Sequence, residues 1–169
     1  IQTLSELWGS LKGRTVAFVG DGNNVATSMV HASVMLGVSV RIATPKGYEL
    51  PNSVLLDAAR VATEGAEVVQ LTDPKKAVEG ADAIYTDAWT SMGQEVEYAE
   101  RKKIFSRYQV NDALMSRAKP SAIFMHCLPA HRGEEVAEEV IESSRSVVFD
   151  QAENRLHAQK ALLLMLIGG

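Results

Sequence analysis

The sequence predicts an α/β fold, a doubly wound parallel sheet formed by a single domain of residues 1–169. Short apolar runs, each long enough for one strand, alternate with segments in which apolar residues recur at helical spacing. Strands separated by helices of this length require crossover connections, which give a parallel sheet covered on both faces. No internal repeat, low-complexity tract or linker divides the chain.

The first elements have the clearest pattern. Residues 15–19 are an apolar run that ends in Gly20-Asp21-Gly22, and helical spacing follows over 24–36, so we expect a strand, a tight turn and a helix. A second strand is predicted at 38–43. The helix predicted at 54–64 ends before a glycine, the residue that best tolerates a left-handed helix end.

The rest of the chain continues the alternation with shorter segments, each identified by an apolar run or by helical spacing. In order, we expect a strand at 68–71, a short helix at 75–78, a strand at 83–86, a helix at 95–105, a strand at 122–125, a helix at 134–142, a strand at 146–149 and a long apolar helix at 154–167.

Composition excludes several classes of function. With 17 basic and 21 acidic residues and a net charge of -4, the chain has no basic stripe for nucleic acid. The longest apolar run, 161–167, is far shorter than the roughly 20 residues of a membrane helix. Cys127 is the only cysteine, so we expect a reduced, cytoplasmic protein. The first residue is Ile, which indicates a start within a longer protein or after processing.

Polar residues follow four of the predicted strands. Ligands of open parallel sheets bind beyond the carboxyl ends of the strands, so these residues predict a site at one edge. The segments are Asp21-Gly22-Asn23-Asn24, Asp87-Ala88-Trp89-Thr90-Ser91-Met92-Gly93, His126-Cys127-Leu128-Pro129 and Glu153-Asn154-Arg155.

Gly20-Asp21-Gly22 also begins the fingerprint of a Rossmann dinucleotide site. The third glycine of that fingerprint is missing, and the second strand ends in Ile42-Ala43-Thr44, without an acid for an adenosine ribose. We therefore expect no nicotinamide cofactor. Asn23 and Asn24 suit a polar zwitterion, because an amide both donates and accepts hydrogen bonds.

Each candidate residue also has a purely structural interpretation. Asp87 could cap a turn, Ser91-Met92-Gly93 could be an ordinary turn, and Cys127 could be a small buried apolar residue. Arg155, predicted to open the last helix, could pair with Glu153 instead of binding a carbonyl or phosphate oxygen.

A zinc site built from His126, Cys127 and His131 has too few ligands and no paired ligand spacing, so we expect no metal. His31 and His157 fall in predicted helices, where packing or surface roles are expected.

Five motifs in order and spacing make nearly the whole chain, from about Leu4 to Leu166, resemble the ornithine carbamoyltransferases. They are Asp21-Gly22-Asn23-Asn24-Val25, Ala43-Thr44-Pro45-Lys46-Gly47-Tyr48, Asp87-Ala88-Trp89-Thr90-Ser91-Met92-Gly93-Gln94, His126-Cys127-Leu128-Pro129 and Glu153-Asn154-Arg155.

The resemblance implies transfer of a carbamoyl group from carbamoyl phosphate to the δ-amine of L-ornithine, giving citrulline and phosphate. It assigns the α-amino and α-carboxylate groups of ornithine to a set of four residues, and the carbamoyl group of carbamoyl phosphate to three. The first set is Asn24, Asp87, Ser91 and Met92, and the second is Cys127, Leu128 and Arg155.

The resemblance also makes Cys127 the proton acceptor for the δ-amine and Arg155 a catalytic residue. Ornithine's side-chain ammonium, with a free pKa near roughly 10, must lose a proton before it attacks. Charge then grows on the carbamoyl oxygen, which Arg155 could stabilise. A thiol accepts a proton only as a thiolate, so the leaving phosphate remains an alternative acceptor.

The family's other half carries a Ser-x-Arg-Thr-Arg phosphate loop and a His-Pro-x-Gln stretch, and neither string occurs here. We therefore expect the N-terminal carbamoyl phosphate-binding domain to be absent from this chain and the chain alone to be inactive. The resemblance implies a homo-oligomer, a trimer or larger. The apolar last helix, with Leu156 and 162–167, predicts self-association or a partner.

Two alternatives remain open. A sister carbamoyltransferase could act on putrescine, N-acetylornithine or aspartate, although Asp87 with Ser91-Met92-Gly93 favours a free α-amino acid and Cys127 disfavours the aspartate enzymes. A non-catalytic amino-acid-binding module would explain the missing half.

Overall fold

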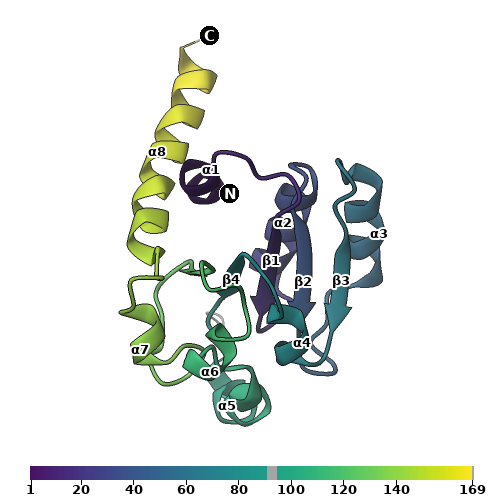
Figure 1. The fold of residues 1–169 in the computed structure, drawn as a ribbon, viewed down its shortest axis with the longest axis vertical. Coiled ribbons are helices and arrows are strands. Elements are labelled where there is room, and N and C mark those ends of the chain that lie inside the picture. The colour runs from purple at the N-terminus through teal and green to yellow at the C-terminus, as the bar shows by residue number, and fades with distance from the viewer. Residues whose placement is uncertain (91–94, 169) are drawn as a thin grey trace.

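The computed structural model describes residues 1–90 and 95–168. Its centre is one five-stranded parallel sheet in the order β3-β2-β1-β4-β5 (Figure 1). The order reverses between β1 and β4, where the chain crosses the sheet to build its second half. This topology confirms the predicted doubly wound α/β fold. The strands are β1 (Thr15–Val19), β2 (Ser39–Ala43), β3 (Val68–Leu71), β4 (Ala83–Thr86) and β5 (Ile123–His126).

Helices connect the strands and cover both faces of the sheet (Figure 1). They are α1 (Gln2–Trp8), α2 (Asn24–Val34), α3 (Asn52–Val61), α4 (Pro74–Val78), α5 (Tyr98–Phe105), α6 (Asp112–Met115), α7 (Glu138–Ile141) and α8 (Val148–Ile167), with two short 3-10 helices, η1 (Glu95–Glu97) and η2 (Ser106–Tyr108).

Alternate residues of the central strand enter two separate apolar clusters. Ala17 and Val19 of β1 pack on one face with residues of α4, α6 and α7. Val16 and Phe18 pack on the other face with residues of α1, α2 and α3. Because both faces are covered, β1 and β4 are buried almost throughout, as their unbroken apolar runs predict. This rigid sheet fixes the loops that follow each strand.

The predicted strand at 146–149 is wrong. The chain pairs with β5 only through an isolated bridge between Ser146 and Phe124, and α8 then begins at Val148. Val148 is fully buried, whereas Phe149 is largely exposed, so the apolar run supplies the start of a helix. The last helix therefore starts six residues before the predicted 154.

Other boundaries differ by less. The helix predicted at 134–142 is confined to Glu138–Ile141, and residues 133–135 before it form a turn. The short helices α1 and α6 were not predicted, because seven and four residues are too few to show a helical period.

Helix α8 projects beyond the sheet, and α1 lies beside its middle (Figure 1). Asn154 joins the two helices by donating to Thr3 and Glu6, while Gln2 donates to its side-chain oxygen. Beyond this contact the helix presents a large apolar surface to solvent. The exposed apolar residues are Leu156, Leu162, Leu163, Leu164, Met165, Leu166 and Ile167.

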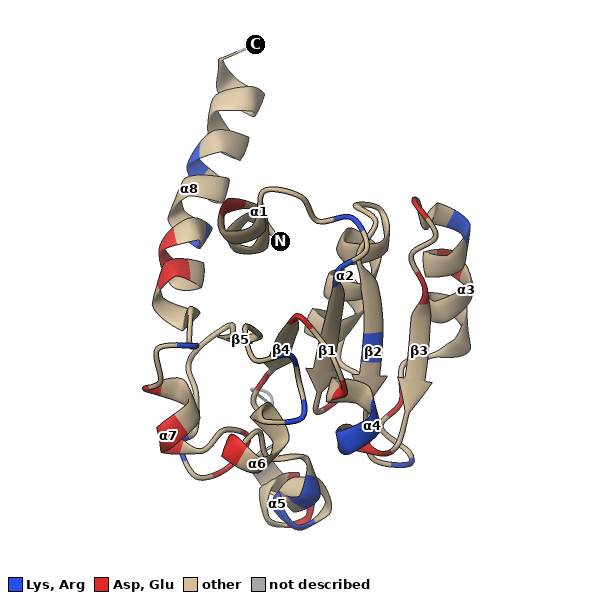
Figure 2. Ribbon diagram, in the orientation of Figure 1, with Lys and Arg blue, Asp and Glu red and all other residues tan. Residues whose placement is uncertain are grey.

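Charges of both signs are scattered over the helices and loops, and the last turns of α8 carry none (Figure 2). Within residues 1–90 and 95–168, no helix combines the length and apolar composition needed to cross a bilayer.

Candidate functional site

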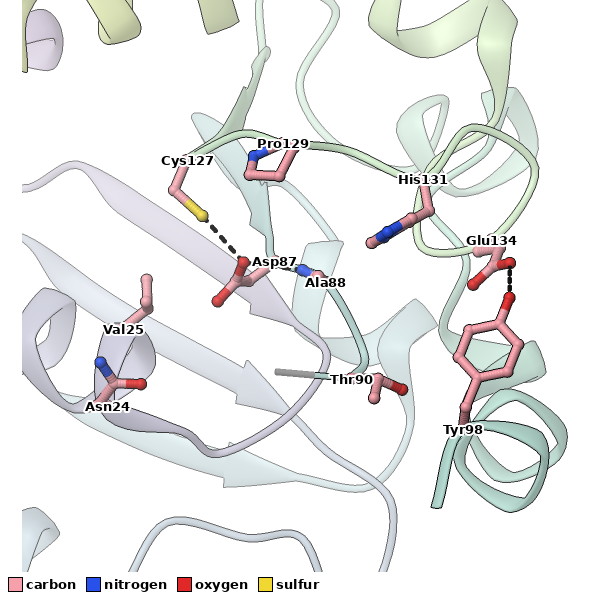
Figure 3. A pocket seen from close by; sticks show the side chains of 10 residues that line it. All are labelled: Asn24, Val25, Asp87, Ala88, Thr90, Tyr98, Cys127, Pro129, His131 and Glu134. Carbon is pink, nitrogen blue, oxygen red and sulfur yellow. Dashed lines mark hydrogen bonds between the residues drawn. The ribbon is translucent and has the colours of Figure 1, made fainter. Parts of the chain in front are cut away.

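A cavity of about 700 Å³ opens at the carboxyl ends of β1, β4 and β5, beside the reversal of strand order (Figure 3). Its volume lies within the range of ordinary small-molecule sites. The wall comes from the start of α2, the loop after β4, helix α5 and the long loop after β5. The lining residues are Asn24, Val25, Asp87, Ala88, Thr90, Tyr98, Cys127, Pro129, His131 and Glu134.

Asp87 is the acidic group at the centre of this wall, and three donors hold its carboxylate (Figure 3). The Cys127 thiol donates to Oδ1 over 2.9 Å, and the backbone N–H of Ala88 donates to the same oxygen over 2.8 Å. The Asn23 amide donates to Oδ2 over 2.9 Å. The charge is therefore fixed in position by groups from the ends of three strands.

The neighbouring asparagines have different roles. Asn23 caps α2, because its side-chain oxygen accepts from the N–H groups of Val25 and Ala26 at 3.0 and 3.1 Å. Its amide nitrogen holds Asp87, so both ends of Asn23 are already used. Asn24 is exposed and lines the cavity. Only Asn24 therefore keeps the freedom to bind a zwitterion.

Cys127 directly follows β5, and its partly buried side chain contacts Asp87. Burial raises the pKa of its thiol to about 12, and the hydrogen bond to Asp87 and the charge of that carboxylate act in the same direction. Cys127 therefore keeps its proton at neutral pH.

This protonation state predicts slow alkylation. At pH 8.5, iodoacetamide should modify the native chain at least ~10-fold more slowly than the urea-unfolded chain, because the thiolate is the nucleophile. Mass spectrometry of quenched samples measures both rates without interference, since Cys127 is the single cysteine. Equal rates in the native and unfolded chains would show that the thiol is not held in its protonated form.

Arg101 of α5 joins two of the loops that carry the site, although it does not line the cavity. The residue is 3% exposed, and its guanidinium forms an ion pair with Asp21 and donates from Nε to the carbonyl of Trp89 over 2.6 Å. The guanidinium also lies over the rings of Tyr48 and Phe105, at 4.8 and 5.2 Å from their centroids. Arg101 thus fixes the loop after β1 against the loop after β4.

Gly22 permits the close approach of the first loop to the segment after β2. A Cβ atom at this position would lie 2.6 Å from the carbonyl oxygen of Tyr48 and 2.7 Å from the nitrogen of Leu50. The Gly22 N–H donates to that same Tyr48 carbonyl over 2.9 Å. The glycine is therefore required by packing against main-chain atoms, without any need for a bound pyrophosphate.

His126 organises the loop after β5 from inside the protein. The N–H of Leu128 donates to its Nδ1 over 2.8 Å, which puts the ring proton on Nε2, and Nε2 donates to Glu135 over 3.2 Å. Both residues are fully buried. Leu128 has a left-handed φ of 56°, unusual for a side chain of this size, and His126 stabilises this turn. His126 is thus a structural residue.

The rim of the cavity beside α5 is closed by side chains that sequence reasoning did not identify. The Tyr98 hydroxyl and the Lys102 ammonium both donate to Oε1 of Glu134. Burial alone would raise the pKa of Glu134, but the hydrogen bonds from Tyr98 and Lys102 outweigh it and leave the pKa lowered. The polar segment 131–135 is the available signal in the sequence, but the helix predicted at 134–142 includes Glu134 and Glu135 and hides it.

The predicted site residues therefore fall into three groups. Asn24, Asp87 and Cys127 meet at the cavity. Ser91 and Met92 lie outside the described residues. Leu128 and Arg155 are not among the described residues that line the cavity.

The position of Arg155 differs from the prediction for a clear reason. It does not open the last helix, because α8 starts at Val148, and it lies about two turns inside α8 with an exposed side chain. Arg155 could contact a substrate only if another part of the protein packed against α8 and enclosed the substrate between them.

Comparison with known proteins gives a family match over most of the chain. Residues 12–166 match the family described as aspartate/ornithine carbamoyltransferase, Asp/Orn binding domain. The ornithine carbamoyltransferase of Thermococcus kodakarensis is 56% identical over 169 residues, which cover 99% of this chain and 54% of that protein. The anabolic ornithine carbamoyltransferase of Pyrococcus furiosus is 56% identical over 168 residues, covering 99% and 53%.

Solved structures match as well. The ornithine carbamoyltransferase structure from Pyrococcus furiosus superposes with a TM-score of 0.93 at 56% identity, covering 99% of this chain and 54% of that one. The one from Thermus thermophilus gives 0.85 at 46% identity, covering 98% and 52%. The chain spans about half the length of the curated relatives it matches.

Proposed function

Because the chain belongs to the aspartate/ornithine carbamoyltransferase family, we propose that it is the ornithine-binding half of an ornithine carbamoyltransferase. The reaction is transfer of the carbamoyl group of carbamoyl phosphate to the δ-amine of L-ornithine, which yields L-citrulline and phosphate. The observation that carries the proposal is the Asp87 carboxylate, held in the cavity beside Asn24 and Cys127.

In this proposal the acidic wall of the cavity selects an α-amino acid. Asp87 faces the α-ammonium group of ornithine, since a fixed carboxylate and an ammonium form a charge-assisted hydrogen bond. Asn24 and the residues Ser91 and Met92 bind the α-amino and α-carboxylate groups from the other sides. The δ-amine then extends toward Cys127.

The route of proton transfer depends on whether the Cys127 thiol is protonated. Cys127 is protonated and already donates to Asp87, so it accepts a proton from the δ-amine only if its own proton moves to that carboxylate. The released phosphate is the alternative acceptor. In either route, desolvation of the closed cavity favours the neutral amine that attacks the carbamoyl carbon.

We further propose that a second half, not part of these 169 residues, binds the phosphate of carbamoyl phosphate and covers the apolar side of α8. Leu128 and Arg155 would contact the carbamoyl group across that boundary. By analogy with the anabolic relative, the complete enzyme would act in arginine biosynthesis in the cytoplasm, as a trimer or larger homo-oligomer.

Ligand titration of the 169-residue chain tests the amino-acid half of the proposal. We expect L-ornithine and L-norvaline to bind with similar affinity, because norvaline keeps the α-amino and α-carboxylate groups and lacks only the δ-amine. N-acetylornithine and putrescine should bind at least ~10-fold more weakly, since each lacks one charged group that the site holds. Chemical shifts in the backbone amide NMR spectrum measure all four affinities.

Two results would contradict the assignment. Tighter binding of putrescine or N-acetylornithine than of ornithine would identify a sister carbamoyltransferase. Binding of none of the four, in a chain whose NMR spectrum is that of a folded protein, would refute an amino-acid site formed by this half.

A further inference from the structure

We propose that His131, Glu134 and Glu135 form a binding site for a divalent transition-metal ion, Zn²⁺ in preference to Mg²⁺, on the wall of the cavity. One ligand atom from each residue lies within 4.8 Å of the others. Imidazole nitrogen favours zinc and its neighbours in the transition series over the hard alkaline-earth ions. The site does not depend on ornithine, and its test is independent of the proposed enzymatic function.

The distances suit a shared ion better than direct hydrogen bonds. His131 Nδ1 lies 3.7 Å from Oε2 of Glu135, too far for a good hydrogen bond. Two ligands that are each about 2.0–2.1 Å from a tetrahedral zinc ion are about 3.3–3.4 Å apart, so this pair needs to close by only about 0.3–0.4 Å. The ligand atom of Glu134, within 4.8 Å of the others, needs a shift of at most about 1.5 Å, which a side-chain rotation can supply, to complete a three-ligand site with water in the fourth position.

Glu135 provides the second, independent indication of a ligand. Its side chain is 1% exposed, and among the described residues its Oε2 atom has no hydrogen-bond partner. Its other oxygen accepts from Nε2 of His126 and from the backbone N–H of His131 at 3.2 and 2.5 Å. One oxygen is thus held by two donors, which orients the free oxygen toward the His131 ring, as outer hydrogen bonds orient metal ligands.

The other two ligands are accessible from the cavity. The His131 side chain is 52% exposed, and both His131 and Glu134 line the cavity wall. Tyr98 and Lys102 bind Glu134 through Oε1, so neither of them engages Oε2 (Figure 3 shows the Tyr98 contact). An ion can therefore reach Glu134 and His131 without displacing the hydrogen bonds of the rim.

Lys102 opposes the binding of a cation. Its ammonium lies 2.9 Å from Oε1 of Glu134, so it reduces the attraction between this carboxylate and a divalent ion. The two carboxylates outweigh this single positive charge. Replacing Lys102 by an uncharged residue should therefore strengthen binding of the ion. A general loss of structure would weaken binding, so it cannot produce this result.

Calorimetric titration of the 169-residue chain with ZnCl₂ tests the site. We expect one ion per chain with micromolar affinity, weakened at least ~10-fold in His131→Ala and tightened about threefold to tenfold in Lys102→Met. His157→Ala is the matched control, because this half-exposed histidine also lies beside a glutamate, 3.5 Å away, on a different surface. It should leave the affinity unchanged. Circular dichroism confirms that each variant is folded.

Cobalt distinguishes this site from binding to the cysteine. Co²⁺ bound by one nitrogen and carboxylate oxygens gives visible d–d absorption without the near-ultraviolet charge-transfer band of a thiolate ligand. Absence of Zn²⁺ binding, unchanged affinity in a folded His131→Ala, loss of affinity in His157→Ala, or a thiolate band that disappears in Cys127→Ser would each overturn the proposal.

Discussion

Replacing Arg101 by methionine is expected to lower the free energy of unfolding by about 3–5 kcal/mol, the usual effect of removing one partner of a buried ion pair. Methionine keeps much of the apolar stem but leaves the Asp21 carboxylate and the Trp89 carbonyl without their donor. For a domain of this size, the melting temperature should fall by roughly 6–20 °C. Urea unfolding followed by circular dichroism measures the loss.

The effect should depend on pH in a defined direction. Burial raises the pKa of Asp21, the Arg101 guanidinium opposes this shift, and the Asp87 carboxylate adds to it. Without Arg101, the pKa of Asp21 rises further. As the pH falls through that raised pKa, Asp21 becomes neutral and the uncompensated charge disappears, so the difference from the native chain should shrink in mild acid.

Two further variants identify the cause. Arg107 is an exposed arginine six residues along the chain, and Arg107→Met should change stability by less than about 0.5 kcal/mol. The double variant Arg101→Met with Asp21→Asn should recover part of the loss, because it removes the unpaired charge. A loss that is equal at all pH values and is not reduced in the double variant would mean that packing, and not the ion pair, is responsible.

Replacing Asp87 by asparagine is expected to weaken L-ornithine binding roughly 10- to 150-fold, which corresponds to about 1.5–3 kcal/mol for a hydrogen bond to a charged group. The substitution keeps the size of the side chain and removes the charge proposed to face the α-ammonium. The NMR titration described for the native chain gives both affinities. Asp57→Asn, at an exposed acid on α3, is the charge-matched control and should bind ornithine normally.

The same variant has a second readout that does not involve ornithine. The hydrogen bond to Asp87 and the charge of that carboxylate both raise the pKa of Cys127, so Asp87→Asn should lower this pKa and speed alkylation at pH 8.5. Unchanged ornithine affinity together with faster alkylation would leave Asp87 as a neighbour of the thiol with no part in substrate binding.

The sequence predicts an element well where its signals are local. The unit of β1 and α2 was predicted within two residues, because its apolar run, its helical period and the capping side chain of Asn23 are contiguous. The run Val147-Val148-Phe149 suggested a strand in the same way. The chain does pair with the free edge of β5, but only at Ser146, because α8 begins at Val148; no local signal in the sequence shows where the bridge ends and the helix begins.

The residues of the site can likewise be predicted from the sequence only where their signal is local. Asp87 and Cys127 could be selected because each directly follows a strand, and parallel strands bring their carboxyl ends together. Arg101 could not be selected, since a basic residue in a charged helix is normally solvated, and its partner Asp21 is 80 residues away. Asn23 and Asn24 have separate roles because only Asn23 caps α2. Two adjacent asparagines in a sequence do not show which of them will be the cap.

At the reversal of strand order between β1 and β4, different parts of the protein form the binding crevice and determine which ligand it selects. The crevice there is formed by the course of the main chain, whereas the side chains that face it belong to connecting loops and to the first turns of α2 and α5. Lining residues that belong to neither of the two apolar clusters that stabilise the domain can be exchanged without disturbing those clusters; four of them are Asn24, Asp87, Thr90 and His131. This division makes the domain a suitable scaffold for retargeting to other amines, with these four residues as the positions to randomise.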